Sequence, residues 1–271
     1  MKANKIDNGR PRGLALVIAL AVIVALAVGV KFGFDQMIRV YDEQCVIRNM
    51  SEQVEITSGK MVHPSTIAEE LGLKVGANLA TIDFRRKGEE IIAKVPNLRA
   101  IRITRRLPDR VVVDAEERVP IARMGLVGNK SVTGRVVDAE GMVFICQRGT
   151  QMLPTIREPQ APGTKKGEKV RGRILAALRL IEACREPEFL ELGLLEVDAS
   201  RRDFLIATLG NYSKVKICWD EMDEPSTRAK HDLDSRLTKL RDAIRSKVTP
   251  DVITWNVTMP GEVFADTQGK L

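Results

Sequence analysis

The feature that most constrains this chain is an uninterrupted apolar run near its start. Residues 13–30, GLALVIALAVIVALAVGV, contain no polar side chain. As a helix that rises ~1.5 Å per residue, this run is roughly 27 Å long, close to the hydrocarbon thickness of a bilayer. A buried helix of a soluble protein is shorter or carries a polar stripe. The run therefore predicts a transmembrane helix over residues 13–34, if Lys31 snorkels toward the headgroups.

Charges on the two sides of the run predict its orientation. Residues 1–12 carry four basic side chains and one acid, whereas the charges after the run are mixed. Such a basic head places the N-terminus in the cytoplasm and everything after the run outside it. A cleaved signal peptide is the alternative, because residues 25–27, ALA, loosely resemble a cleavage site. The run continues past that point and is longer than a usual signal core, which favours an uncleaved anchor.

The composition favours a folded chain without a metal or redox site. The 271 residues fit roughly two domains, and the net charge is +7. The four cysteines are far apart and form no C-x-x-C pair, so we expect small buried hydrophobic side chains, although an oxidising compartment would permit disulfides. His63 and His231 are the two histidines, too few for a histidine-rich metal site or a Ser-His triad.

Residues 53–120 read as strand, helix, helix, strand, strand. Alternating apolar and polar residues over 101–122 predict a hairpin around the turn at residues 107–109. Pro64 suits the first position of a short helix, and Asp83 is a plausible N-cap of a second helix that ends before Pro96. A three-stranded sheet with both helices on one face would bury all these apolar sides.

This module, placed directly after a single membrane span, resembles a POTRA domain, and its motifs are similar to the FtsQ/DivIB family of bacterial cell-division proteins. The matching strings are GANL at residues 76–79, VPNL at 95–98, RITRRLPDRV at 102–111, ERVPIA at 117–122 and VDAEGMVF at 137–144. Two departures are the lack of an aromatic residue near Leu98 and His63 where a capping serine is common.

Residues 121–266 predict a second domain of strands and helices. Strands around a turn at Gly141 and a short strand near residues 153–156 precede a helix over 170–185. Three strands over 194–219 have connections short enough for an antiparallel meander, and strands over 252–258 and 262–266 end the chain. By resemblance, this order suits the β-domain of the same family. The fold class is therefore α+β, with a single transmembrane helix, a β-α-α-β-β POTRA domain and a mixed domain with an extended antiparallel-rich sheet.

A long helix to about residue 247 carries an apolar stripe. The stripe comprises Ala229, Leu233, Leu237, Leu240, Ile244 and Val248. A coiled coil is one interpretation, but the pattern is shorter than the several heptads that a coiled coil needs. We favour an amphipathic helix that lies on the sheet.

The resulting domain plan has six parts. They are a basic cytoplasmic head (1–12), a transmembrane helix (13–34), a stalk (35–52), a POTRA domain (53–120), a β-domain (121–266) and a frayed tail (267–271).

The sequence lacks the signatures of common catalytic and nucleic-acid-binding proteins. It contains no G-x-S-x-G, H-E-x-x-H, Walker A or G-x-G-x-x-G motif. Its basic residues are interleaved with acids and aromatic residues are scarce, which argues against nucleic-acid binding. Basic residues at 85–87 and 105–106 could meet anionic lipid headgroups or an acidic partner, although a solvated face is the simpler interpretation. We expect no enzyme, no cofactor, no metal and no small-molecule substrate.

What remains is binding through backbone groups at a sheet edge. The resemblance implies that the C-terminal edge of the β-domain receives a segment of FtsB/FtsL (DivIC) type partners, and that the POTRA domain meets other division proteins. The region that matches this edge is residues 252–265. The candidate partner-binding residues are Val252, Ile253, Trp255, Val257, Glu262, Val263, Phe264 and Ala265.

The resemblance therefore implies a non-catalytic, single-pass scaffold of the division machinery. It would lie in the cytoplasmic (inner) membrane at the septum, with its bulk outside the cytoplasm, and regulate septal peptidoglycan synthesis. The alternative is a POTRA-bearing factor of envelope protein transport or assembly, which would carry a β-barrel or further POTRA repeats.

Overall fold

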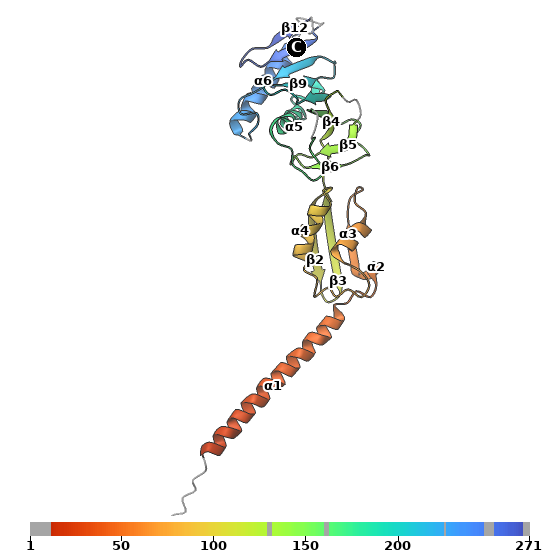
Figure 1. The fold of residues 1–271 in the computed structure, drawn as a ribbon, viewed down its shortest axis with the longest axis vertical. Helices are drawn as coiled ribbons and strands as arrows, with labels where there is room; N and C mark the ends of the chain where they lie inside the picture. Colours follow the sequence, from red (N-terminus) through yellow and green to blue (C-terminus); the bar gives the residue numbers. More distant parts are fainter. Residues whose placement is uncertain (1–11, 129–131, 160–162, 225, 247–251, 268–271) are drawn as a thin grey trace, which may run out of the picture. The chain divides into compact units, whose positions relative to one another are not determined.

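The computed structural model describes residues 12–128, 132–159, 163–224, 226–246 and 252–267 (Figure 1). Most of the predicted basic head, nearly all of the predicted tail and Val248 of the apolar stripe lie outside these residues.

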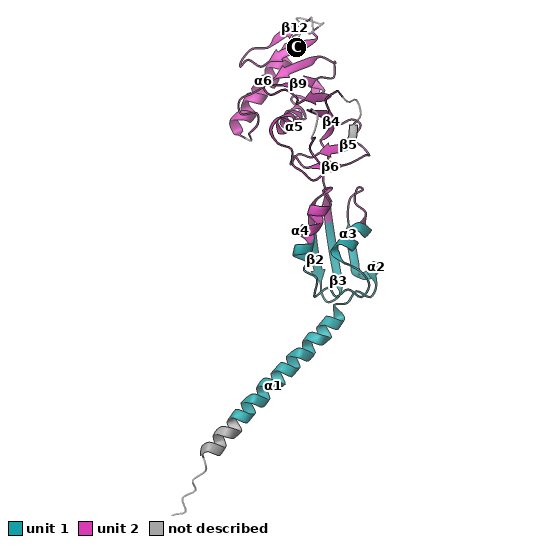
Figure 2. Cartoon of the chain, in the orientation of Figure 1, with its two compact units in different colours: residues 1–57, 65–87, 102–114 teal, residues 58–64, 88–101, 115–271 magenta. Residues whose placement is uncertain are grey.

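The chain divides into two compact units (Figure 2). Unit 1 comprises residues 1–57, 65–87 and 102–114, and unit 2 comprises residues 58–64, 88–101 and 115–271. The predicted domain boundaries remain predictions.

Helix α1 (Arg12–Gln44) is the long apolar helix of unit 1. Within the described residues, its segment Leu20–Gln44 is long and apolar enough to cross a membrane, and the most apolar stretch of that segment is not buried. The helix continues past residue 34, so the first part of the predicted stalk is helical. Just after α1, the Ile47 N–H donates to the Ala77 carbonyl at 2.9 Å and the Leu79 N–H donates to the Cys45 carbonyl at 2.9 Å. These hydrogen bonds attach the segment that follows α1 to the loop at residues 77–79 of unit 1.

The predicted order strand, helix, helix, strand, strand is confirmed. A short α2 (Met50–Gln53), which the sequence did not predict, precedes the five elements β1 (Val54–Thr57), α3 (Pro64–Leu71), α4 (Phe84–Lys94), β2 (Leu98–Arg106) and β3 (Arg110–Glu117). The sheet order is β1-β3-β2, with β1 parallel to β3. Asp83 Oδ1 accepts a hydrogen bond from the Arg86 N–H at 3.1 Å, as expected of an N-cap.

Unit 2 contains a nine-stranded mixed sheet. Its strands are β4 (Ala122–Leu126), β5 (Val132–Val137), β6 (Val143–Ile145), β7 (Thr155–Glu158), β8 (Glu196–Asp198), β9 (Leu205–Thr208), β10 (Lys214–Ile217), β11 (Thr254–Val257) and β12 (Phe264–Asp266). Their order is β12-β11-β10-β9-β8-β7-β4-β5-β6. Strands β8, β9 and β10 form the predicted antiparallel meander. Strand β11 joins β10 in parallel, and β12 then turns back antiparallel to β11.

Two helices, α5 (Gly172–Cys184) and α6 (Thr227–Arg245), pack side by side on this sheet, and the short 3-10 helix η1 (Leu190–Leu192) follows α5. In α6, the stripe residues Ala229, Leu233, Leu237 and Leu240 are buried in one core cluster with sheet residues. This packing confirms an amphipathic helix on the sheet rather than a coiled coil.

The four cysteines are free thiols, and most of them are buried, as expected of small hydrophobic side chains. Cys45, Cys146 and Cys184 are buried, and Cys218 is half-buried. Burial raises the pKa of the Cys184 thiol to about 12 and also raises the pKa of Cys218. Since a thiol reacts as its thiolate, Cys184 is unreactive and acts as a small hydrophobic side chain.

Candidate functional site

The nine-stranded sheet ends at β12, which pairs with β11 on one side. The register sets Trp255 opposite Ala265 and Asn256 opposite Phe264. On the other side of β12, no strand within the described residues pairs with it. The backbone N–H and C=O groups along such an edge are a template for a further strand.

The opposite edge of the same sheet, at β6, is covered by a loop. The Val143 N–H donates to the Glu168 carbonyl at 3.0 Å, and the Gly167 N–H donates to the Val143 carbonyl at 2.8 Å. These backbone bonds occupy the outer side of β6. The β12 edge is therefore the better candidate for strand addition in this sheet.

The register also assigns the β12 side chains to the two faces of the sheet. Residues directly opposite in an antiparallel pair point to the same face. Trp255 and Val257 are buried in the core cluster that includes α6, so Ala265 lies toward the helix-covered face. Phe264 lies toward the other face and is 50% exposed.

Burial divides the eight candidate partner-binding residues into two groups. Trp255 and Val257 belong to the core, and Val252 and Val263 are partly buried against it. The exposed members are Ile253, Glu262, Phe264 and Ala265. Only the exposed side chains are accessible to a binding partner. The buried and partly buried side chains instead pack in the core beneath the two strands.

A buried arginine that the sequence analysis missed holds the end of β11. Arg236 of α6 is 3% exposed, and its NH1 group donates to the carbonyls of Val257 and Thr258, each at 2.9 Å. Its Nε group donates to Asp232 Oδ2 at 3.1 Å. Its position in the sequence could have revealed its burial. Arg236 follows Leu233 by three residues and so falls on the apolar side of α6.

The turn between β11 and β12 has further local support. Asn256 Oδ1 accepts from the Thr258 N–H at 3.1 Å and from the Thr258 hydroxyl at 2.8 Å. Gly261 has a φ of +87°, a conformation that a side chain disfavours. Together with Arg236, these contacts fix where β12 begins.

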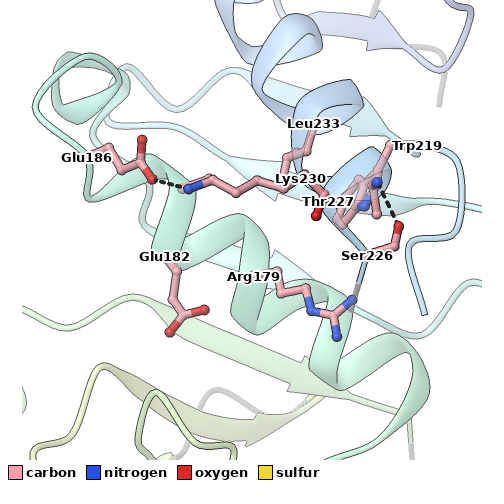
Figure 3. A pocket seen from close by; sticks show the side chains of 10 residues that line it. Arg179, Glu182, Glu186, Trp219, Ser226, Thr227, Lys230 and Leu233 are labelled. Carbon is pink, nitrogen blue, oxygen red and sulfur yellow. Dashed lines mark hydrogen bonds and ion pairs between the residues drawn. The ribbon is translucent and has the colours of Figure 1, made fainter. Parts of the chain in front are cut away.

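A pocket of about 390 Å³ lies between α5 and the start of α6 (Figure 3). Lys230 reaches toward Glu186 with 3.2 Å between Nζ and Oε1, and the Ser226 Oγ accepts from the Ala229 N–H at 2.9 Å. Burial raises the pKa of the Glu182 carboxyl. Ser226 caps α6 and donates its hydroxyl to Glu221 Oε2 at 2.5 Å, and Lys230 pairs with Glu186. These contacts give the side chains structural roles, as a helix cap and an ion pair.

Comparison with known proteins finds similarity to a bacterial cell-division protein. No family model matches the chain. The cell division protein FtsQ of Corynebacterium glutamicum is 23% identical over 171 residues, which are 63% of this chain and 68% of that protein. This similarity supports assignment to the FtsQ/DivIB family.

Proposed function

We propose that this chain, assigned to the FtsQ/DivIB family by that similarity, is a membrane-anchored scaffold of bacterial cell division that binds its partner by strand addition to β12. The observation that carries the proposal is the outer side of β12, with which no strand of the described part of the chain pairs, in a nine-stranded sheet whose opposite edge is covered. The scaffold has no catalytic step of its own and is held by α1.

The proposed partners are division proteins of the FtsB/FtsL (DivIC) type, which come from the family resemblance. Their segment extends the sheet through main-chain hydrogen bonds, and its side chains lie beside Phe264 on one face and Ala265 on the other. In this arrangement the N-terminus is cytoplasmic, the two units lie outside at the septum, and the bound complex regulates septal peptidoglycan synthesis.

The test is a pull-down of the full-length chain in detergent with the outer domains of these partners from the same organism. Phe264→Asp places a charge beside the added strand, and Ala265→Pro removes an N–H group and obstructs strand pairing. Each change should weaken binding about tenfold or more, equivalent to about 1.4 kcal/mol. Both substitutions lie on β12 because a substitution at the β11 residue Val257, which is 1% exposed, would disturb the core.

The matched control is Tyr212→Asp, which also replaces an exposed aromatic residue with an acid. Tyr212 is 80% exposed and lies in the turn between β9 and β10. The Tyr212→Asp variant should bind the partner domains as strongly as the wild type does. Unchanged binding by both β12 variants, or an equal loss in the control, would contradict strand addition at this edge.

A further inference from the structure

Two loops of unit 1 present apolar side chains next to basic ones beside the end of α1. The first loop carries Lys74 and Val75, and Val75 is 64% exposed. The second is the β2–β3 turn with Arg106 and Leu107, and Leu107 is 65% exposed. Exposed aliphatic tips flanked by lysine and arginine match the interface of an anionic bilayer, where acyl chains meet charged headgroups.

Hydrogen bonds fix the first loop to the segment that follows α1. The Gly76 N–H donates to the Ile47 carbonyl at 2.8 Å, and Asn78 Nδ2 donates to the Asp42 carbonyl at 3.1 Å. Asp42 lies within the last turn of α1. The loop with Val75 is therefore held at the membrane-proximal end of unit 1.

The β2–β3 turn is fixed to the same end. Gln53 Nε2 donates to Asp109 Oδ2 at 2.8 Å, and Gln53 Oε1 accepts from the Arg48 N–H at 2.6 Å. Asp109, the acid of this turn, is thus engaged within the protein. Gln53 Nε2 also donates to the Val46 carbonyl at 3.4 Å, so the turn is joined through Gln53 to the segment that follows α1.

The distance along α1 is short enough for contact with the headgroups. From Phe34 to Tyr41 the helix rises about 10 Å, and each headgroup layer is roughly 5–7 Å thick. Phe34, Met37, Ile38 and Tyr41 are exposed and recur with helical spacing, so an apolar stripe continues from the predicted span toward the turn. Long basic side chains cover the remaining distance.

We infer that Lys74, Val75, Arg106 and Leu107 form a membrane-contact rim that binds anionic lipid headgroups next to α1. The rim restricts how unit 1 can rotate and tilt on its anchor. The inference rests on the part of the proposed function that places α1 across the membrane, but it is independent of strand addition at β12.

The test uses the full-length chain in nanodiscs whose lipids carry bromine near the headgroup, a quencher of tryptophan fluorescence. A Leu107→Trp variant reports contact, after subtraction of the wild-type signal from Trp219 and Trp255, which are both buried. Bilayers of phosphatidylcholine alone are compared with bilayers that also contain phosphatidylglycerol. The control is Thr57→Trp, an exposed position of unit 1 at the end of β1 that is farther from α1.

We expect Leu107→Trp to be quenched in the anionic bilayer and much less in phosphatidylcholine, while Thr57→Trp stays unquenched in both. Adding Lys74→Glu and Arg106→Glu, or raising the salt to about 1 M where the screening length is ~3 Å, should abolish the difference. Absence of quenching in the anionic bilayer, or equal quenching in both bilayers, would overturn the inference. Failure of the chain to co-purify with nanodiscs would instead show that α1 does not anchor the protein. The proposed membrane-contact rim would then be refuted as well.

Discussion

Arg118 and Arg236 are buried charged residues whose guanidinium groups donate to backbone carbonyls. Arg118 is 6% exposed, and its Nε group donates to the Pro96 carbonyl at 3.0 Å. Arg236 binds two carbonyls at the end of β11. Removal of either guanidinium takes a donor away from backbone carbonyls and from a carboxylate, which costs more than the loss of a surface contact of the same geometry.

Arg236→Met should destabilise the protein by about 2–4 kcal/mol, because the carbonyls of Val257 and Thr258 lose a donor and Asp232 loses one of its two donors. It should also weaken partner binding, since the β11–β12 turn loses its support. Urea unfolding followed by the fluorescence of Trp219 and Trp255, both in the core of unit 2, measures the first effect.

Arg228→Met on the same helix is the control for this change. Arg228 pairs with Asp220 at 3.4 Å, but its side chain is 74% exposed. Its loss should cost at most about 0.5 kcal/mol. Equal effects of the two substitutions would refute the supporting role of Arg236.

Glu140 should give a pH-dependent contribution to stability. A hydrogen bond from Arg99 lowers the pKa of its carboxyl most, and a hydrogen bond from Arg118 lowers this pKa further. A folded-state pKa below the unfolded value means that the folded state binds fewer protons, so this stability is present above about pH 4.3 and is lost as the pH falls through the folded pKa.

Glu140→Gln should therefore lower the urea midpoint at pH 7, and its difference from the wild type should shrink from about pH 5 to about pH 3. A difference that stays constant over this range would mean that the carboxylate charge of Glu140 plays no part.

At the scale of elements, one network in unit 2 joins the end of β3 to the β5–β6 hairpin. Just after β3, Arg118 NH1 lies 2.6 Å from Asp138 Oδ2, and Asp138 Oδ1 accepts from the Met142 N–H at 2.8 Å. Asn97 Nδ2 donates to the Ile145 carbonyl at 2.8 Å. Three of the strings that suggested the family, at 95–98, 117–122 and 137–144, thus meet in one network.

A double-mutant cycle with Arg118→Met and Asp138→Asn should reveal strong coupling. Asp138→Asn alone leaves the buried Arg118 charge with Glu140, at 3.2 Å, as its carboxylate partner, and should cost about 3 kcal/mol. The double variant should cost clearly less than the sum of the two single variants, as measured by urea unfolding.

Arg99→Ala, at the exposed end of the network, is the reference for this cycle. Arg99 is 52% exposed and pairs with Glu116 at 2.9 Å, so its loss should cost at most about 1 kcal/mol. Additive effects of Arg118→Met and Asp138→Asn would show that the two side chains do not act together.

The sequence predicted most elements because their signals are local. Alternation over residues 101–122, Pro64 and Asp83 each act within a few residues. The edge position of β12 is not local, because it depends on α6 returning the chain so that β11 lies parallel to β10. For the same reason, the sequence did not show that Trp255 and Val257, two of the candidate partner-binding residues, are buried in the core that includes α6.

At the scale of the whole molecule, the proposed anchor and the proposed binding edge belong to different units. Helix α1 and the proposed membrane-contact rim are parts of unit 1, and β12 is part of unit 2. Changes in the rim should therefore leave partner binding at β12 intact, and changes at β12 should leave anchoring intact. This separation suits a scaffold that is fixed to a membrane and holds a partner.

Amide hydrogen exchange of the full-length chain, with and without an FtsB/FtsL type partner, tests the central claim most directly. Addition of a strand to β12 predicts new protection in peptides that cover residues 261–267, while peptides that cover β6 stay unchanged because its edge is already bonded. Binding that leaves residues 261–267 unprotected, and instead protects β1, β2 or another surface, would contradict the claim.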